Sequence, residues 1–175
     1  MTDASVYVTR DEVTRAIELT GRKPSHARIG LFLRFLWLTG CRVSEALGAS
    51  SEHLDTGLGV VRLRTLKKKK ETWRALPLPA DFMASLADLG PGPLFPWSRA
   101  HAYKLVRHAL EAAGVDAPRA HPHAIRHGHG VHATRNNVPL NVLQRVFGHA
   151  SIATTGVYLQ VTGKDVSRYY DSVVW

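Results

Sequence analysis

Residues 29 to 38 constrain the fold most, because they predict a helix that is apolar on most of its sides. Its apolar residues are Ile29, Leu31, Phe32, Leu33, Phe35, Leu36 and Leu38. Such a helix has to be surrounded by other elements, so we expect it at the centre of the protein. Ser25 and Gly40 are typical of its two ends, as N-cap and C-cap. Arg34 interrupts the run, which is too short to span a bilayer.

Helical patterns also flank this segment on both sides. Thr9 and Glu12 have the spacing of a capping box and begin a helix that extends to about Thr20. Five later segments are also predicted to be helical from their apolar spacing and end signals, and they are Asp81–Leu89, Ser98–Ala113, His123–Arg135, Leu140–Phe147 and Ser151–Val161. Most of the chain is therefore expected to be helical.

Residues 58 to 78 have a different pattern, in which apolar and polar side chains alternate. In LGVVRLRT, at residues 58 to 65, Val61 and Leu63 would lie on one face and the two arginines on the other. TWRALPL, at residues 72 to 78, predicts a second strand. The hairpin loop between them contains four lysines, Lys67 to Lys70. This run fits a solvated loop that protects a sheet edge, and it fits equally a cationic finger that reaches DNA phosphates.

These patterns predict an α+β fold that is mainly α-helical, with a small antiparallel sheet or hairpin on one edge. A chain of 175 residues is long enough to bury one real core. We expect a single domain over residues 1–175, with the hairpin at about 58–78 and a C-terminal tail at 162–175.

The charge balance indicates a polyanionic partner. The chain contains 23 Lys and Arg against 14 Asp and Glu, for a net charge of +9. Domains this basic typically bind nucleic acid or an acidic membrane surface. The alternative is a generically basic protein without such a partner. The segment Ser98–Ala113 predicts a helix with an apolar back and a basic front, which fits either a DNA-binding helix or a solvated surface helix. The candidate DNA-binding residues of this helix are Arg99, Tyr103, Lys104 and Arg107.

The sequence contains few features that indicate a cellular compartment. A single cysteine, Cys41, excludes an intramolecular disulfide and fits a reducing cytosol. The N-terminal residues lack the charged-then-apolar pattern of a secretion signal. We therefore expect a soluble cytoplasmic protein without a membrane partner.

The stretch from His121 to Tyr158 contains the residue types of an anion-binding reactive site. His123 and Arg126 are three residues apart, so a helix places them on one face. His149 follows a helix-ending glycine, and Tyr158 lies nine residues further on. Each motif alone carries little information, since a lone tyrosine on a helix is usually a core or rim residue.

A second histidine pattern, His127, His129 and His132, raises the question of a metal site. On a helix, His127 and His129 would point about 200° apart, which is poor geometry for binding one ion. We expect no metal at this string and leave His129 and His132 without a role.

Taken in order, four motifs resemble the catalytic domain of the tyrosine recombinases of the phage-integrase type. They are TGCRVSEAL, LKKKK before LPLP, HPHAIRH and GHASIATTGVY. The resemblance extends from about Val8 to Val161. It implies six catalytic residues, which are Arg42, Lys67, His123, Arg126, His149 and Tyr158. From its position alone, Arg42 would be a surface residue near a helix end.

The resemblance also implies supporting and DNA-contacting residues. Glu45, three residues after Arg42, matches an acidic position that supports the site, and His127 matches a histidine packed beneath it. Lys68 and Lys69 remain alternatives to Lys67 as the proton donor. The lysines expected to contact DNA are Lys68, Lys69 and Lys70.

The implied reaction is site-specific cleavage and rejoining of DNA through a 3′-phosphotyrosine on Tyr158. It needs neither a metal nor a nucleotide cofactor. The implied partners are double-stranded DNA, further copies of the chain in a tetramer on DNA, and accessory DNA-bending proteins. Two other functions remain open from the sequence: a catalytically weak DNA-binding regulator of the same fold, and a type IB topoisomerase.

The chain departs from the family pattern at its start. Family members usually carry an N-terminal core-binding domain, and here the catalytic pattern begins within about ten residues of Met1. The interpretation is either a minimal recombinase without that domain or a catalytic fragment of a longer protein. The apolar residues of the tail fit packing on a neighbouring copy as well as packing on its own chain.

Overall fold

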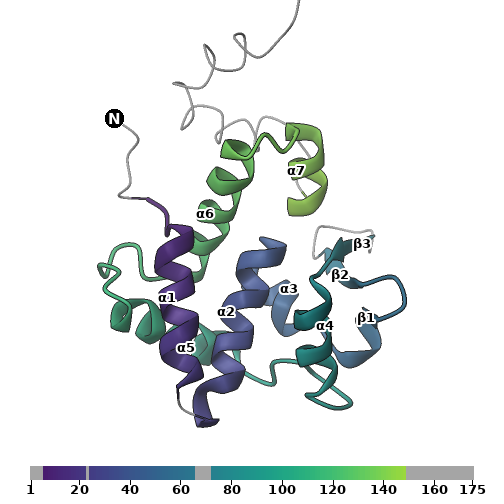
Figure 1. The fold of residues 1–175 in the computed structure, drawn as a ribbon, viewed down its shortest axis with the longest axis horizontal. Helices are drawn as coiled ribbons and strands as arrows, with labels where there is room; N and C mark the ends of the chain where they lie inside the picture. The colour runs from purple at the N-terminus through teal and green to yellow at the C-terminus, as the bar shows by residue number, and fades with distance from the viewer. Residues whose placement is uncertain (1–5, 23, 66–71, 149–175) are drawn as a thin grey trace, which may run out of the picture.

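The computed structural model describes residues 6–22, 24–65 and 72–148. Figure 1 shows a helical body with a small sheet at one side. The helices are α1 (Arg10–Gly21), η1 (Pro24–His26), α2 (Ala27–Thr39), α3 (Val43–Leu47), η2 (Ser51–His53), α4 (Ala80–Ala87), α5 (Arg99–Ala112), α6 (Pro122–Arg135) and α7 (Leu140–Phe147). The strands are β1 (Leu54–Asp55), β2 (Val60–Thr65) and β3 (Thr72–Pro77). This confirms the predicted mainly helical α+β fold.

Helix α2 lies at the centre, as its apolar pattern predicts. It packs against α1, α3, α5 and α6 (Figure 1). Phe32, Leu33, Phe35 and Leu36 are at most 1% exposed. The helix ends at Gly40, which adopts a left-handed conformation with φ of 56° and donates its N–H to the carbonyl of Leu36. Glycine is suited to this conformation because it has no Cβ.

The predicted N-cap of this helix is wrong. Ser25 lies inside the short 3₁₀ helix η1, and His26 occupies the N-cap position of α2 without a side-chain capping bond. Pro24 begins η1, and its fixed φ suits the first position of a helical turn. The predicted capping box is confirmed, since Thr9 forms it completely with Glu12. Ser98 is the N-cap of α5 and accepts a bond from the N–H of His101.

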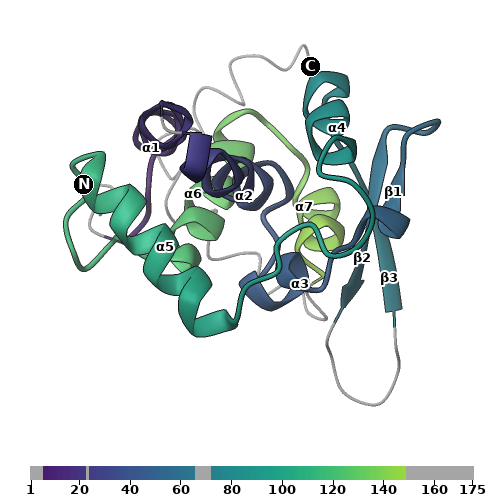
Figure 2. The same cartoon turned by 90° about the horizontal axis from the view of Figure 1, so that it is seen from below.

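The sheet is antiparallel, with the strand order β1-β2-β3, and Figure 2 shows it at one edge of the molecule. Val61 and Leu63 are buried, whereas Arg62 and Arg64 face solvent. The strand begins at Val60 rather than Leu58 because residues 56–59 form a turn. The short strand β1 was not predicted, since two residues are too few to show an alternation. Thr65 pairs with Thr72 at the base of the lysine loop, whose residues 66–71 lie outside the described part.

Helix α6 lies very close to the N-terminal segment. The N–H of Val8 donates to the carbonyl of Ala124 at 3.2 Å. A Cβ added at Gly128 would overlap the carbonyl oxygen of Val8 and would lie 3.1 Å from Trp37. Only a glycine therefore permits this approach of the two backbones.

Among the described residues, no helix is long and apolar enough to cross a membrane.

Gly128→Ala should destabilise the protein, because the added methyl group has to displace the backbone of Val8. Overpacking of this kind costs about 1–3 kcal/mol, which urea denaturation can measure. The matched control is Gly21→Ala at the end of α1, where an added Cβ meets nothing within 4 Å. That variant should keep or slightly raise the stability. Equal free energies of unfolding for the two variants would contradict the close approach.

Candidate active site

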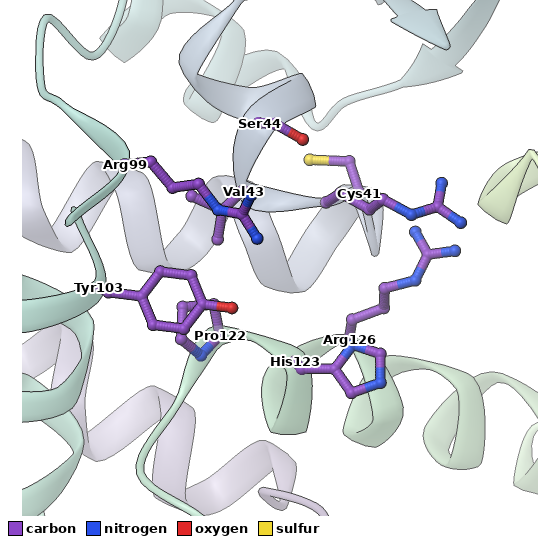
Figure 3. A pocket seen from close by; sticks show the side chains of 9 residues that line it. Cys41, Val43, Ser44, Arg99, Tyr103, Pro122, His123 and Arg126 are labelled. Carbon is purple, nitrogen blue, oxygen red and sulfur yellow. The ribbon is translucent and has the colours of Figure 1, made fainter. Parts of the chain in front are cut away.

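Three segments that are far apart in the sequence meet around a pocket of about 130 Å³. The start of α3, the start of α5 and the start of α6 provide its walls (Figure 3). The lining residues are Cys41, Arg42, Val43, Ser44, Arg99, Tyr103, Pro122, His123 and Arg126. The structure therefore brings together three of the six predicted catalytic residues.

Arg126 is the most buried cation of this pocket, with 3% of its surface exposed. Its Nη1 donates to the carbonyl of Gly40 at 2.7 Å, and its Nη2 donates to the carbonyl of Phe147 at 3.1 Å. These carbonyls terminate α2 and α7, where unpaired oxygens and the helix dipole attract a positive charge. The guanidinium also lies 4.4 Å from the centre of the Phe147 ring. The two carbonyls thus fix the guanidinium of Arg126, and because they carry no net charge they do not cancel its positive charge.

Gly40 makes this arrangement sterically feasible. A Cβ at this position would lie 2.6 Å from Cε1 of Phe147 and 2.7 Å from Cδ2 of His129. Those distances are shorter than van der Waals contact. The glycine therefore ends α2, presents its carbonyl to Arg126 and leaves space for the Phe147 ring.

Arg42 is held differently, at the N-cap of α3. Its backbone N–H donates to Oε2 of Glu45 at 2.8 Å, and its Nη1 lies 3.3 Å from Oε1 of the same carboxylate. The side chain is 38% exposed, so part of the guanidinium remains accessible from the pocket. The residue is at a helix end, as its position suggests, but it has a defined partner.

Glu45 and Arg74 form a buried ion pair behind Arg42. Arg74 donates from Nη2 to Oε2 of Glu45 at 2.7 Å and from Nη1 to Oε1 at 3.2 Å. Burial raises the pKa of Glu45, but the hydrogen bonds from Arg74 and from the Arg42 N–H outweigh it and hold the pKa below its ordinary value. The sequence interpretation found Glu45 and missed Arg74. The available signal was an arginine that shares the inward face of its strand with Leu76, where a charge needs a buried partner.

His123 lies at the exposed start of α6, beside two other histidines. Its ring centre is 4.9 Å from that of His127 and 6.4 Å from that of His121. Partial burial and the nearby charges of His127 and Arg126 lower the pKa of His123 below 6.5. The imidazole is therefore mostly neutral at neutral pH and is able to accept a proton. Burial and Arg126 also lower the pKa of His127.

The histidine string does not converge on one point. Nδ1 of His129 lies 2.7 Å from the carbonyl oxygen of Trp37, and the His132 ring packs 5.6 Å from the Trp37 ring. Within the described residues, no group of three or more His, Cys, Asp or Glu is arranged to hold a metal ion.

The candidate DNA-binding helix α5 divides into two parts. Arg99 and Tyr103 line the pocket, where the guanidinium of Arg99 lies 5.9 Å from the Tyr103 ring centre (Figure 3). Lys104 and Arg107 are exposed outside the pocket, and Arg107 pairs with Glu111 at 2.8 Å. The structure leaves both interpretations of this helix open.

The remaining predicted residues lie outside the described part of the chain. They are Lys67, Lys68, Lys69, Lys70, His149 and Tyr158. Their sequence neighbours Thr65 and Gly148 nevertheless meet near the site. A Cβ at Gly148 would lie 3.4 Å from both Oγ1 of Thr65 and Nη1 of Arg74.

Glu45→Gln should lower the free energy of unfolding at pH 7 by roughly 3 kcal/mol, because Arg74 would lose its buried countercharge. The pKa of Glu45 is lowered by folding, so its contribution is complete above the ordinary value of 4.5 and is lost as the pH falls through the folded value. Urea denaturation at several pH values should show the wild-type advantage shrinking below about pH 4.5. Glu111→Gln, at an exposed pair, is the control and should cost less than about 1 kcal/mol. A pH-independent difference would contradict the ionised pair.

Comparisons with known proteins show the family to which the chain belongs. The sequence model of the phage integrase family matches residues 7–90 and 94–164. The chain is 28% identical to tyrosine recombinase XerD of Bifidobacterium longum, over 93% of this chain and 60% of that protein. It is 32% identical to tyrosine recombinase XerD of Mycobacterium tuberculosis, over 89% of this chain and 56% of that protein. The chain thus spans little more than half the length of these relatives.

Solved structures share the fold at lower identity. The XerH site-specific recombinase bound to difH substrate matches with a TM-score of 0.78 and 21% identity, over 95% of this chain and 54% of that one. The catalytic domain of bacteriophage HP1 integrase matches with a TM-score of 0.71 and 21% identity, over 94% of both chains. The family match includes the pocket arginines and the segment that carries Tyr158, and the chain therefore belongs to the phage integrase family.

Proposed function

We propose that this protein is a site-specific recombinase that cleaves and rejoins double-stranded DNA through a 3′-phosphotyrosine on Tyr158. The observation that carries the proposal is the convergence of Arg42, Arg126 and His123 on one pocket from separate segments. This arrangement combines two cations with a proton acceptor, as attack on a phosphodiester requires. Membership of the phage integrase family supports the same reaction.

The two arginines would bind the phosphoryl oxygens of the scissile phosphate. A guanidinium presents planar donors that match a phosphate, and fixed donors are most effective where negative charge develops in the transition state. Arg126 suits this role because two backbone carbonyls fix it. Arg42 is more accessible and would complete the clamp from the opposite segment. His149, which belongs to the same predicted set, would add a further donor.

Proton transfers complete the mechanism. His123 would take the phenolic proton of Tyr158 as the tyrosine oxygen forms its bond to phosphorus. The bond from phosphorus to the 5′-oxygen breaks, and Lys67 or a neighbouring lysine would give that oxygen a proton. The phosphotyrosine retains the energy of the broken bond, so attack by a 5′-hydroxyl rejoins the strand without a nucleotide cofactor.

The proposed partners are duplex DNA and further copies of the chain. A net charge of +9 supports binding to a polyanion. The related XerH recombinase has been solved with its difH substrate, which supports DNA as the partner here. We infer that the chain acts as a catalytic domain, since it covers the HP1 integrase catalytic domain over nearly its whole length. Strand exchange between two sites would need an assembly on DNA, which we expect to be a tetramer.

A nicked suicide substrate should trap a covalent protein–DNA adduct, which denaturing gel electrophoresis detects. The nick lies next to the cleavage site, so cleavage releases a short fragment that carries the free 5′-hydroxyl. This fragment diffuses away, and rejoining stops. The chain contains five tyrosines, and each Tyr→Phe variant is tested separately. Only Tyr158→Phe should abolish the adduct while DNA binding persists. An adduct in that variant, or none in the wild type with its own target DNA, would refute the proposal.

The pH dependence of adduct formation should report His123. The rate of adduct formation is measured where it is proportional to protein concentration, so that its pH profile reports the free protein. The acid limb, where the rate falls as the pH is lowered, should lie below pH 6.5 because the pKa of His123 is lowered. His127→Asn removes a charge that lowers this pKa, so the limb should move to higher pH. His132→Asn is the control: it lies on the same helix, but its charge is not among those that act on His123. Identical shifts in both variants would contradict the assignment.

A further inference from the structure

Arg74 connects three elements behind the pocket that are far apart in the sequence. Besides its two bonds to Glu45, its Nη1 donates to Oγ1 of Thr65 at 2.8 Å, and its Nε donates to the carbonyl of Val146 at 2.9 Å. The side chain is 10% exposed. One guanidinium therefore connects the end of β2, helix α3 and the last turn of α7.

Each of these connections leads to a predicted catalytic residue. Glu45 binds both the backbone and the guanidinium of Arg42. Thr65 is two residues before Lys67, and Val146 is three residues before His149. The Gly148 position also lies against Arg74 and Thr65. Arg74 thus lies behind the pocket, at the point where the supports of several reacting groups meet.

We propose that Arg74 is a positioning residue for strand cleavage, acting chiefly through Glu45 on Arg42. The inference rests on the proposed recombinase function, and it adds a residue that is not among those lining the pocket. Without the bidentate contact from Arg74, the Glu45 carboxylate could rotate and Arg42 would lose its fixed partner. Small displacements of a phosphate-binding group are costly in rate.

The bonding pattern requires an arginine. The planar fork binds two carboxylate oxygens, and the same side chain still reaches Thr65 and Val146 through its other N–H groups. A lysine offers one compact ammonium and cannot reproduce this geometry. Arg74→Lys therefore retains the charge but loses the positioning, which separates electrostatic support from orientation.

The test compares Arg74→Lys with Arg119→Met. Arg119 is also largely buried, at 15% exposure, and it pairs with Glu12 and Asp116 and donates to the carbonyl of Tyr7, away from the pocket. Urea denaturation gives the folded fraction, and all rates are measured where each variant is folded. Arg74→Lys should form the suicide-substrate adduct ten- to a hundredfold more slowly, with DNA binding nearly unchanged. Arg119→Met should lose stability but cleave at the wild-type rate.

A double-mutant cycle identifies the route of the effect. If Arg74 acts through Arg42, then Arg74→Lys should slow an Arg42→Ala protein by less than about threefold, far less than it slows the wild type. Multiplicative losses in the double variant would overturn the inference, as would an unchanged rate for Arg74→Lys alone. If Arg74→Lys does not fold, Thr65→Val serves instead, because it removes one acceptor of Arg74 and keeps the shape of the side chain. That variant should show a smaller loss with the same dependence on Arg42, and no loss would refute the proposal.

Adduct formation by the wild-type protein distinguishes failure of the positioning role from failure of the proposed recombinase function. Absence of a wild-type adduct refutes the recombinase activity. A normal wild-type adduct together with full activity of Arg74→Lys refutes the positioning role alone.

Discussion

The buried guanidinium of Arg126 imposes the main constraint on this structure. Arg126 is 3% exposed, and burying a guanidinium without partners would cost several kcal/mol. The carbonyl oxygens of Gly40 and Phe147 offset this cost. They lie at the C-terminal ends of two helices, where the backbone already has oxygens that need donors. The positions of α2, α6 and α7 relative to one another are thus tied to one side chain.

The two pocket arginines illustrate two ways of holding a cation. Two backbone carbonyls, which carry no net charge, accept hydrogen bonds from Arg126. A carboxylate supports Arg42, and that carboxylate is itself neutralised by Arg74 behind it. The second arrangement keeps Glu45 from cancelling the charge that faces the pocket. Both arrangements place a guanidinium at the pocket, with supports from distant parts of the chain.

Local patterns predicted the local structure well. The width of the apolar face identified α2 as central, and the alternation around Val61 located the strands. The order of the family motifs in the sequence predicted that Arg42, His123 and Arg126 belong to one site. The prediction of Ser25 as the N-cap of α2 was wrong because Ser25 belongs to the 3₁₀ helix η1, which precedes α2. Arg74 was missed because its partner Glu45 is 29 residues away, and periodicity carries no information about such a pairing. The roles of Lys67, His149 and Tyr158 stay predictions, since these residues lie outside the described part.

The glycine at the end of α2 has a consequence for how the site forms. Gly40 provides a carbonyl to Arg126 only when α2 has ended there, and the Phe147 ring fills the space beside it only when α7 has docked. A chain with either step incomplete would lack one of the two carbonyl acceptors of Arg126. Small domains tend to fold in one cooperative transition, so the pocket and the core should appear together. Partly folded copies, such as those still being synthesised, would then carry the excess positive charge of the chain without a formed pocket.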